Sequence, residues 1–247
     1  MEVKERIIVS LDVPNLSQAL NLVTELRDEV AYFKVGLELL SSAGPTVVEK
    51  IKELGGRVFY DGKFFDIPNT VAGASRAVTR LGVAMFNVHT MGGLGMMRAA
   101  HQAAIEISHQ LSIPPPLVLG VTLLTSLDEN IMNQELAIPG RLEERVVWFA
   151  GLASEAGLDG VIASPQEIAA IRRSLPKGKV IVVPGVRPIW AESFDQKRIA
   201  TPKEAIAGGA TYLVIGRPII HPPAEIGSPK EAVKLINAEI AEVNFVN

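Results

Sequence analysis

The sequence contains no cysteine, and this absence excludes disulfide bonds, thiolate metal sites and a cysteine nucleophile. It also lacks an excess of basic residues. Because the formal net charge is −3, there is no positive field to attract a nucleic-acid backbone, and no nucleic-acid partner is expected. Any anion must therefore be bound by a local group of residues.

Long apolar runs are missing as well. The longest one, around Pro114 to Leu124, is too short to span a bilayer, and Met1 to Arg6 lacks the apolar core of a signal peptide. We therefore expect no membrane partner and a cytoplasmic location, which the absence of cysteine also fits.

Aromatic residues are scarce, at 5%, although hydrophobic residues make up 48% of the chain. The core must then consist mainly of Val, Ile, Leu and Ala, which is typical of parallel strands buried on both faces. A length of 247 residues fits one large α/β barrel, although two smaller domains would also be possible.

Eight short apolar runs of strand length recur along the chain, each followed by a longer segment with helical spacing. The predicted strands are Arg6–Leu11, Ala31–Val35, Arg57–Tyr60, Ala84–Val88, Leu117–Val121, Gly160–Ala163, Val180–Val183 and Tyr212–Ile215. Helix start signals stand at Asn15, Pro45, Pro165 and Pro202. Strict alternation of strands and helices predicts a closed (β/α)₈ TIM barrel, with a doubly wound open sheet as the alternative.

No repeat, low-complexity tract or linker interrupts this series, so residues 1–247 are predicted to form a single domain. The fifth connection, from Thr122 to about Leu158, is long enough for an extra short helix before the main helix that begins near Arg141.

Polar residues follow the predicted strands at the end where barrel active sites lie. In chain order they are Asp12, Lys34, Asp61 with Lys63, Asn87 with His89, Thr122 with Thr125 and Ser126, Ser164, Gly185, and Gly216 with Arg217. An isolated ammonium at Lys34 would be costly in its apolar surroundings, so a carboxylate should meet it. Asp61 or Asp12 is the expected partner.

The segment Asp61-Gly62-Lys63-Phe64-Phe65-Asp66 sets two carboxylates and an ammonium directly after an apolar strand. Side chains two apart on an extended segment point the same way, which predicts Asp61 beside Lys63, with Asp66 on the following loop. The alternative is a solvated turn with an ordinary surface ion pair, worth about 0–1 kcal/mol.

The seventh and eighth strand ends have the features of a phosphate site. Gly185 and Gly216 allow backbone amides to approach an anion, and Arg217 begins a new element there. A simple turn at Gly216 is the alternative. The long, basic segment 185–200 is predicted to be a lid that closes over a charged ligand, or else a loop with no closing role.

Residues 61–70, Asp-Gly-Lys-Phe-Phe-Asp-Ile-Pro-Asn-Thr, resemble the signature Asp-x-Lys-x-x-Asp-Ile-Pro-x-Thr of the orotidine 5′-monophosphate decarboxylase family. Six further segments match the family in the same order, so that the resemblance covers essentially the full chain. They are Leu11-Asp12, Phe33-Lys34-Val35-Gly36, Leu124-Thr125-Ser126, Pro184-Gly185-Val186-Arg187, Asp195-Gln196-Lys197-Arg198 and Gly216-Arg217.

The resemblance implies a homodimeric, cofactor-independent and metal-independent enzyme that converts orotidine 5′-monophosphate to UMP in de novo pyrimidine biosynthesis. It implies that Lys63 donates the proton within a charge network of Lys34, Asp61, Lys63 and the partner's Asp66. The substrate-binding residues that it implies are Asp12, Lys34, Thr125, Ser126, Arg187, Gln196, Gly216 and Arg217, with Ile67 and Thr70 at the shared dimer site.

Two other functions share part of this pattern. A Mg²⁺-dependent sugar-phosphate decarboxylase or hexulose-phosphate synthase shares the Asp-x-Lys-x-x-Asp element, but the Ile67-Pro68-x-Thr70 extension, Leu124-Thr125-Ser126 and the Asp195-Gln196 pair argue against it. A non-catalytic nucleotide-binding barrel would have no need of a lysine held by two carboxylates.

Overall fold

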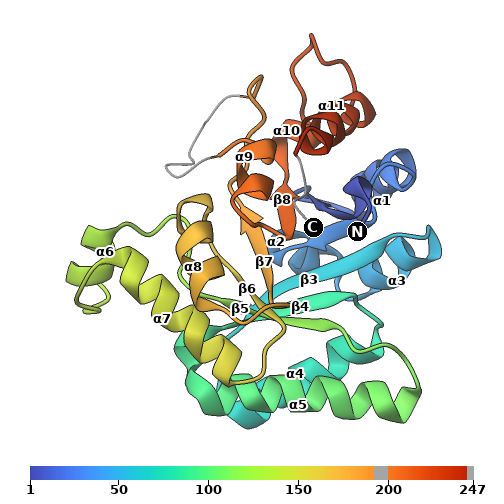
Figure 1. The fold of residues 1–247 in the computed structure, drawn as a ribbon. Coiled ribbons are helices and arrows are strands. Elements are labelled where there is room, and N and C mark those ends of the chain that lie inside the picture. Colours follow the sequence, from blue (N-terminus) through green and yellow to red (C-terminus); the bar gives the residue numbers. More distant parts are fainter. Residues whose placement is uncertain (192–199, 244–247) are drawn as a thin grey trace.

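The computed structural model describes residues 1–191 and 200–243, and it forms a closed barrel of eight parallel strands (Figure 1). The strands are β1 (Ile7–Ser10), β2 (Tyr32–Val35), β3 (Arg57–Phe64), β4 (Met85–His89), β5 (Leu117–Val121), β6 (Gly160–Ile162), β7 (Val180–Pro184) and β8 (Tyr212–Ile215). Each strand pairs with the next, and β8 pairs with β1. The predicted (β/α)₈ barrel is thus confirmed, because an open sheet would leave two edge strands without this closing pair.

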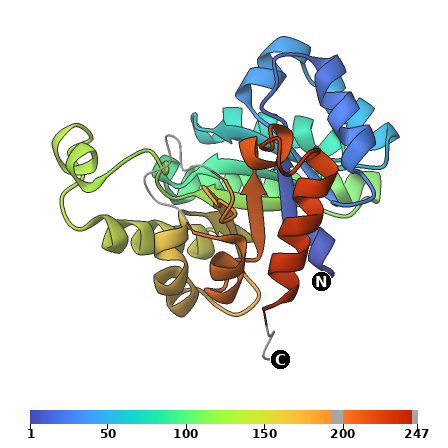
Figure 2. The same ribbon diagram turned by 90° about the horizontal axis from the view of Figure 1, so that it is seen from above.

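The described helices cover the outside of the barrel. They are α1 (Leu16–Leu26), α2 (Leu37–Ala43), α3 (Thr46–Glu53), α4 (Pro68–Arg80), α5 (Gly93–Leu111), α6 (Glu129–Gln134), α7 (Leu142–Glu155), α8 (Ile168–Ser174), α9 (Pro202–Ala207), α10 (Arg217–Ile220) and α11 (Pro229–Ala241), with 3₁₀ turns at Val3–Glu5, Thr90–Gly92 and Pro165–Glu167. The C-terminal helix α11 lies beside the N-terminal segments and closes the ring of helices (Figure 2). Within the described ranges, no helix is long and apolar enough to cross a membrane.

Local signals explain where several helices begin. The Asn15 side chain accepts a hydrogen bond from the Gln18 amide and caps α1, and Pro202 occupies the first turn of α9. The short helix predicted in the fifth connection is α6, and the main helix that follows it has Arg141 at its N-cap position.

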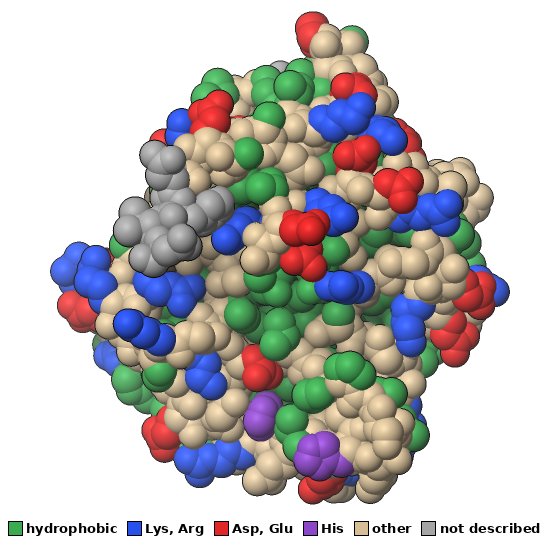
Figure 3. All heavy atoms as spheres, turned by 45° about the vertical axis from the view of Figure 1, so that its right-hand side comes forward, with side chains coloured by type: hydrophobic (Ala, Val, Ile, Leu, Met, Phe, Trp, Pro, Cys, Tyr) green, Lys and Arg blue, Asp and Glu red, His purple; other side chains and the backbone are tan. Residues whose placement is uncertain are grey.

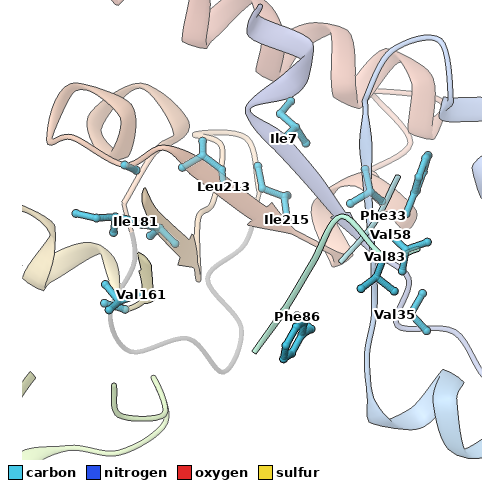
Figure 4. Close-up of a cluster of buried hydrophobic side chains, with 14 of the residues drawn as sticks. Ile7, Phe33, Val35, Val58, Val83, Phe86, Val161, Ile181, Leu213 and Ile215 are labelled. Carbon is cyan, nitrogen blue, oxygen red and sulfur yellow. The ribbon is translucent and has the colours of Figure 1, made fainter. Parts of the chain in front are cut away.

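Two hydrophobic layers hold the barrel together. Side chains that face inward, such as Ile8, Phe59 and Val182, fill its interior. Their neighbours along the strands face outward against the helices, and Figure 4 shows part of this outer layer, with Ile7, Phe33 and other labelled side chains. Because the side chains of a strand alternate between its two faces, each strand contributes to both layers.

Strand β3 differs from its prediction, because it ends at Phe64 rather than at Tyr60. Its pairing with β4 is interrupted by a bulge. Tyr60 is opposite Phe86 and Phe64 is opposite Val88, so that three residues of β3, Asp61 to Lys63, lie opposite the single residue Asn87. The charged pair therefore lies within an irregular part of the strand and not beyond its end.

Candidate active site

A cavity of about 240 Å³ opens at the carboxyl ends of the strands. It is lined by Ser10, Asp12, Lys34, Phe59, Asp61, Lys63, Val121, Leu123, Leu124, Thr125, Ile162, Pro184, Gly185, Arg187, Val214, Gly216 and Arg217. Ends of strands far apart in the sequence thus meet at one opening, as the parallel barrel predicts.

Four charged side chains form a continuous line along one wall. Lys34 Nζ lies 3.2 Å from Asp12 Oδ1 and 3.1 Å from Asp61 Oδ2. On the other side of the same carboxylate, Lys63 Nζ donates to Asp61 Oδ1 at 2.8 Å. Negative and positive charges therefore alternate from Asp12 to Lys63, and Lys34 contacts both of the carboxylates that the sequence suggested as its partners.

Burial makes the central pair of this line, Lys34 and Asp61, different from a surface ion pair. The Asp61 side chain is 9% exposed and that of Lys34 is 12% exposed. Burial alone would raise the pKa of Asp61, but Lys34, Lys63 and the hydrogen bonds to its oxygens outweigh it and leave this pKa below its ordinary value. Burial alone would likewise lower the pKa of Lys34, but Asp61 and Asp12 together raise it. Both groups are thus held in their charged forms.

Gly36 leaves the space that the Lys34 ammonium needs. A β-carbon at this position would lie 2.9 Å from Lys34 Nζ, which is closer than side-chain packing allows. The buried Ser10 hydroxyl, at the end of β1, donates to Asp12 Oδ2 at 2.8 Å and orients this carboxylate. Sequence reasoning missed Ser10. Its position two residues after the inward-facing Ile8 could have identified it, because side chains two apart on a strand face the same way.

The opposite wall is formed by the ends of β7 and β8. Gly185, with φ of +79°, and Gly216 bring backbone close to the cavity, and Arg187 and Arg217 line it from the same side. The Arg187 guanidinium is buried, and its Nη1 donates to the Val186 carbonyl at 3.0 Å. Two guanidinium groups thus flank the part of the opening where the sequence predicted a phosphate site.

Three predicted site residues lie outside their own chain's cavity lining. Asp66, Ile67 and Thr70 are exposed, with Ile67 67% accessible, and none of them lines the cavity. The Asp66 carboxylate accepts a hydrogen bond from the Ile67 amide at 2.6 Å. Ser126 is also exposed and outside the cavity lining, next to Thr125, which is part of it.

Gln196 lies outside the described residues, as do all residues 192–199 of the predicted lid 185–200.

Sequence reasoning also missed the apolar wall. Phe59, Leu123, Ile162 and Val214 also line the cavity. Only the folded barrel reveals such a surface, because each of these residues looks like an ordinary core residue in the sequence.

Among the described residues, no three His, Asp or Glu side chains come together in a way that could hold a metal ion. The carboxylates of the cavity already have ammonium partners. On the face of the molecule shown in Figure 3, basic and acidic side chains are interspersed, as expected from the small net charge.

Fold and site together define a (β/α)₈ barrel with an enzyme-type site, in which buried charges and an apolar wall surround a cavity at the carboxyl ends of the strands. The chain belongs to the orotidine 5′-phosphate decarboxylase / HUMPS family, which it matches over residues 5–235.

Relatives described as orotidine 5′-phosphate decarboxylase are similar over nearly their whole length. The chain is 51% identical to the one from Moorella thermoacetica, over 98% of this chain and 95% of the relative, and 47% identical to the one from Syntrophomonas wolfei, over 98% and 100%. The crystal structure of the Lactobacillus acidophilus enzyme of that description superposes with a TM-score of 0.82 at 33% identity, covering 96% of this chain and 99% of the other.

Proposed function

We propose that this protein decarboxylates orotidine 5′-monophosphate to UMP and carbon dioxide in pyrimidine biosynthesis, as a cytoplasmic enzyme without metal or cofactor. The observation that supports this most directly is the line of charges Asp12, Lys34, Asp61 and Lys63, with its centre at Lys34 and Asp61 buried, beside an apolar wall. The curated relatives of this description, at 44–51% identity, support the same substrate.

The chemistry requires a cation at the reacting carbon. When the bond between the ring carbon and the carboxylate breaks, its electron pair stays on the carbon as a localised carbanion, and carbon dioxide leaves. In our proposal the Lys63 ammonium stabilises this charge and then gives its proton to the same carbon. Asp61, which contacts both ammonium groups, keeps Lys63 oriented.

One lysine is not sufficient for the whole rate enhancement. Two unit charges about 4 Å apart interact by about 4 kcal/mol at an effective dielectric constant near 20, which corresponds to about three powers of ten in rate. The remainder must come from binding energy that is realised in the transition state. Phosphate binding by Arg187, Gln196, Gly216 and Arg217, with closure of segment 185–200, is the proposed source.

The remaining site residues receive binding roles in this proposal. Asp12 would bind ribose hydroxyls, and Thr125 and Ser126 would face the pyrimidine. The positions of Asp12 and Thr125 on the cavity wall support these roles.

The direct test is the loss of orotidine 5′-monophosphate absorbance with purified protein, in buffer with EDTA. Turnover that continues in EDTA supports the proposal. Activity that is lost in EDTA and restored by Mg²⁺ would favour the sugar-phosphate enzymes of the same family, and UMP binding without turnover would favour a nucleotide-binding barrel.

We further propose a homodimer in which Asp66, Ile67 and Thr70 complete the partner's site. Their exposure, and that of Phe65 at 59%, supports this, because none of these residues lines the cavity of its own chain. Neither subunit would then have a whole site alone.

Mixing two inactive variants tests the shared site. Lys63→Ala and Asp66→Ala chains, allowed to exchange, should regain activity, because a mixed dimer has one site with both defects and one with neither. Random exchange makes about half the dimers mixed and should restore roughly a quarter of wild-type activity. If mass spectrometry shows exchange but activity stays at the level of the separate variants, Asp66 acts within its own chain.

A further inference from the structure

Asn87 lies on β4 opposite the bulge of β3, with its side chain completely buried. It is not part of the cavity lining. Its amide nevertheless contacts both charged residues of the bulge. Nδ2 donates to Asp61 Oδ1 at 2.7 Å, and Oδ1 accepts from the Lys63 backbone amide at 2.7 Å.

These two contacts need an amide side chain. The Lys63 N–H can only donate, so an oxygen must face it, and the Asp61 carboxylate can only accept, so an N–H must face it. A carboxylic acid satisfies both neighbours only when protonated. An aliphatic side chain of the same size satisfies neither and leaves buried polar groups unpaired.

The bulge explains why this support is needed. Three residues of β3 face one residue of β4, so the Lys63 amide has lost the strand partner that regular pairing would provide. Lys63 also has φ of +49°, a left-handed conformation that residues other than glycine rarely adopt. Such a conformation persists only where the surroundings hold it in place.

We infer that Asn87 is a positioning residue that fixes the Lys63 backbone in its left-handed conformation and ties it to the Asp61 carboxylate, so that the Lys63 ammonium is aimed into the cavity. The inference rests on the proposed role of Lys63. Asn87 itself touches no substrate and acts through Asp61 and Lys63.

The first test is Asn87→Leu, with orotidine 5′-monophosphate as substrate. We expect kcat to fall by about 100-fold, because a displacement of about 1 Å at the reacting group has an effect of this size. KM and UMP affinity should stay within about threefold, since the binding residues of the cavity do not contact Asn87. Thr79→Val is the control. It removes the buried hydroxyl that donates to the Ser75 carbonyl within α4, and kcat should be unchanged.

The second test is Asn87→Asp, which keeps the shape of the Asn87 side chain. It tests the inference even if the Asn87→Leu variant does not fold. The new carboxyl would be buried against Asp61, with Lys63 nearby and Lys34 on the far side of Asp61, so burial and the like charge should raise its pKa. Once protonated, it can donate to Asp61 again. The ratio of its kcat to the wild-type kcat should therefore rise at least about threefold as pH falls from about 8 to about 6, whereas the ratio for Asn87→Leu should stay flat.

A kcat for Asn87→Leu within about threefold of wild type, or a loss that Thr79→Val reproduces, would overturn the inference. So would a flat ratio for Asn87→Asp. If the wild-type protein has no turnover at all, the proposed function fails separately. In that case, crystal structures of the Asn87 variants test the positioning role of Asn87. An unchanged Lys63 conformation and an unchanged contact between Lys63 Nζ and Asp61 would refute this role.

Discussion

The two ends of the barrel both hold buried polar groups, but they are built differently. At the carboxyl end, Lys34 and Lys63 flank Asp61 at the edge of an open cavity. At the amino end, the Arg57 guanidinium lies 5.5 Å from the centre of the Tyr32 ring and donates to the Tyr32 hydroxyl at 3.3 Å. Tyr212 packs edge-on against Tyr32, with ring centres 5.4 Å apart.

This difference links the carboxyl end of the barrel to binding and the amino end to stability. At the amino end, the buried Tyr32 hydroxyl accepts from an exposed guanidinium that also pairs with Glu5, and burial raises the pKa of Tyr212, so this hydroxyl stays neutral. At the carboxyl end, full charges are held where a ligand can reach them. Substitutions at the carboxyl end should therefore change activity, and substitutions at the amino end should change stability.

The largest effect is expected for Lys63→Ala. Turnover should fall by at least about 1,000-fold while UMP affinity changes little, because the ammonium matters chiefly for charge that develops in the transition state. Steady-state kinetics and calorimetric UMP titration measure the two quantities. Lys50→Ala, which breaks an exposed ion pair with Glu53, serves as the control. Turnover of Lys63→Ala within tenfold of wild type would remove Lys63 from the mechanism.

Arg217→Ala should have the next largest effect. We expect kcat/KM to fall about 100-fold, mainly through KM, because a guanidinium bound to phosphate contributes about 2–3 kcal/mol. Arg173→Ala, at an exposed position of α8, is the matched control. A KM within threefold of wild type would show that the phosphate binds elsewhere.

Tyr32→Phe tests the amino end. Loss of the hydroxyl that accepts from Arg57 should lower the free energy of unfolding by about 1 kcal/mol, and kcat should stay within about twofold. Urea unfolding and steady-state kinetics measure both. A tenfold loss of kcat would show that the two ends are coupled and that the contrast between them is wrong.

The smallest effect concerns pH. Burial and the charge of Lys63 lower the pKa of His89 below its ordinary value. The unfolded chain therefore binds a proton near pH 6.5 that the folded chain resists, and stability should fall as pH drops from about 6.5 to the lowered pKa of His89. Urea unfolding between pH 5 and 8 should show a shallower slope for His89→Gln than for wild type. Equal slopes would mean that His89 titrates normally in the folded protein.

Much of this architecture could be predicted from the sequence. Alternating apolar runs and amphipathic segments predicted all eight strands, because burial on both faces requires continuous apolar residues in every strand. The sequence also predicted a carboxylate partner for Lys34, because an isolated buried ammonium is costly. Both Asp12 and Asp61 contact it.

The bulge and the apolar wall could not be predicted from the sequence in this way. An extended strand would place Asp61 and Lys63 side by side by simple alternation, whereas they meet here through a left-handed turn of the backbone that Asn87 supports from the next strand. A local pattern does not show this, because the partner lies 24 residues away along the chain.

The sequence by itself determined the barrel, the end of the barrel at which the charges gather, and the residue types available there, since these follow from hydrophobic periodicity and from the order of strand ends. The tertiary structure decided which charges touch. Pairing of β1 with β2 and of β2 with β3 brings Asp12, Lys34 and Asp61 together, and pairing of β3 with β4 aligns Asn87 with the bulge. Ion-pair distances and the direction of a side chain depend on contacts between strands, and these exist only once the chain has folded.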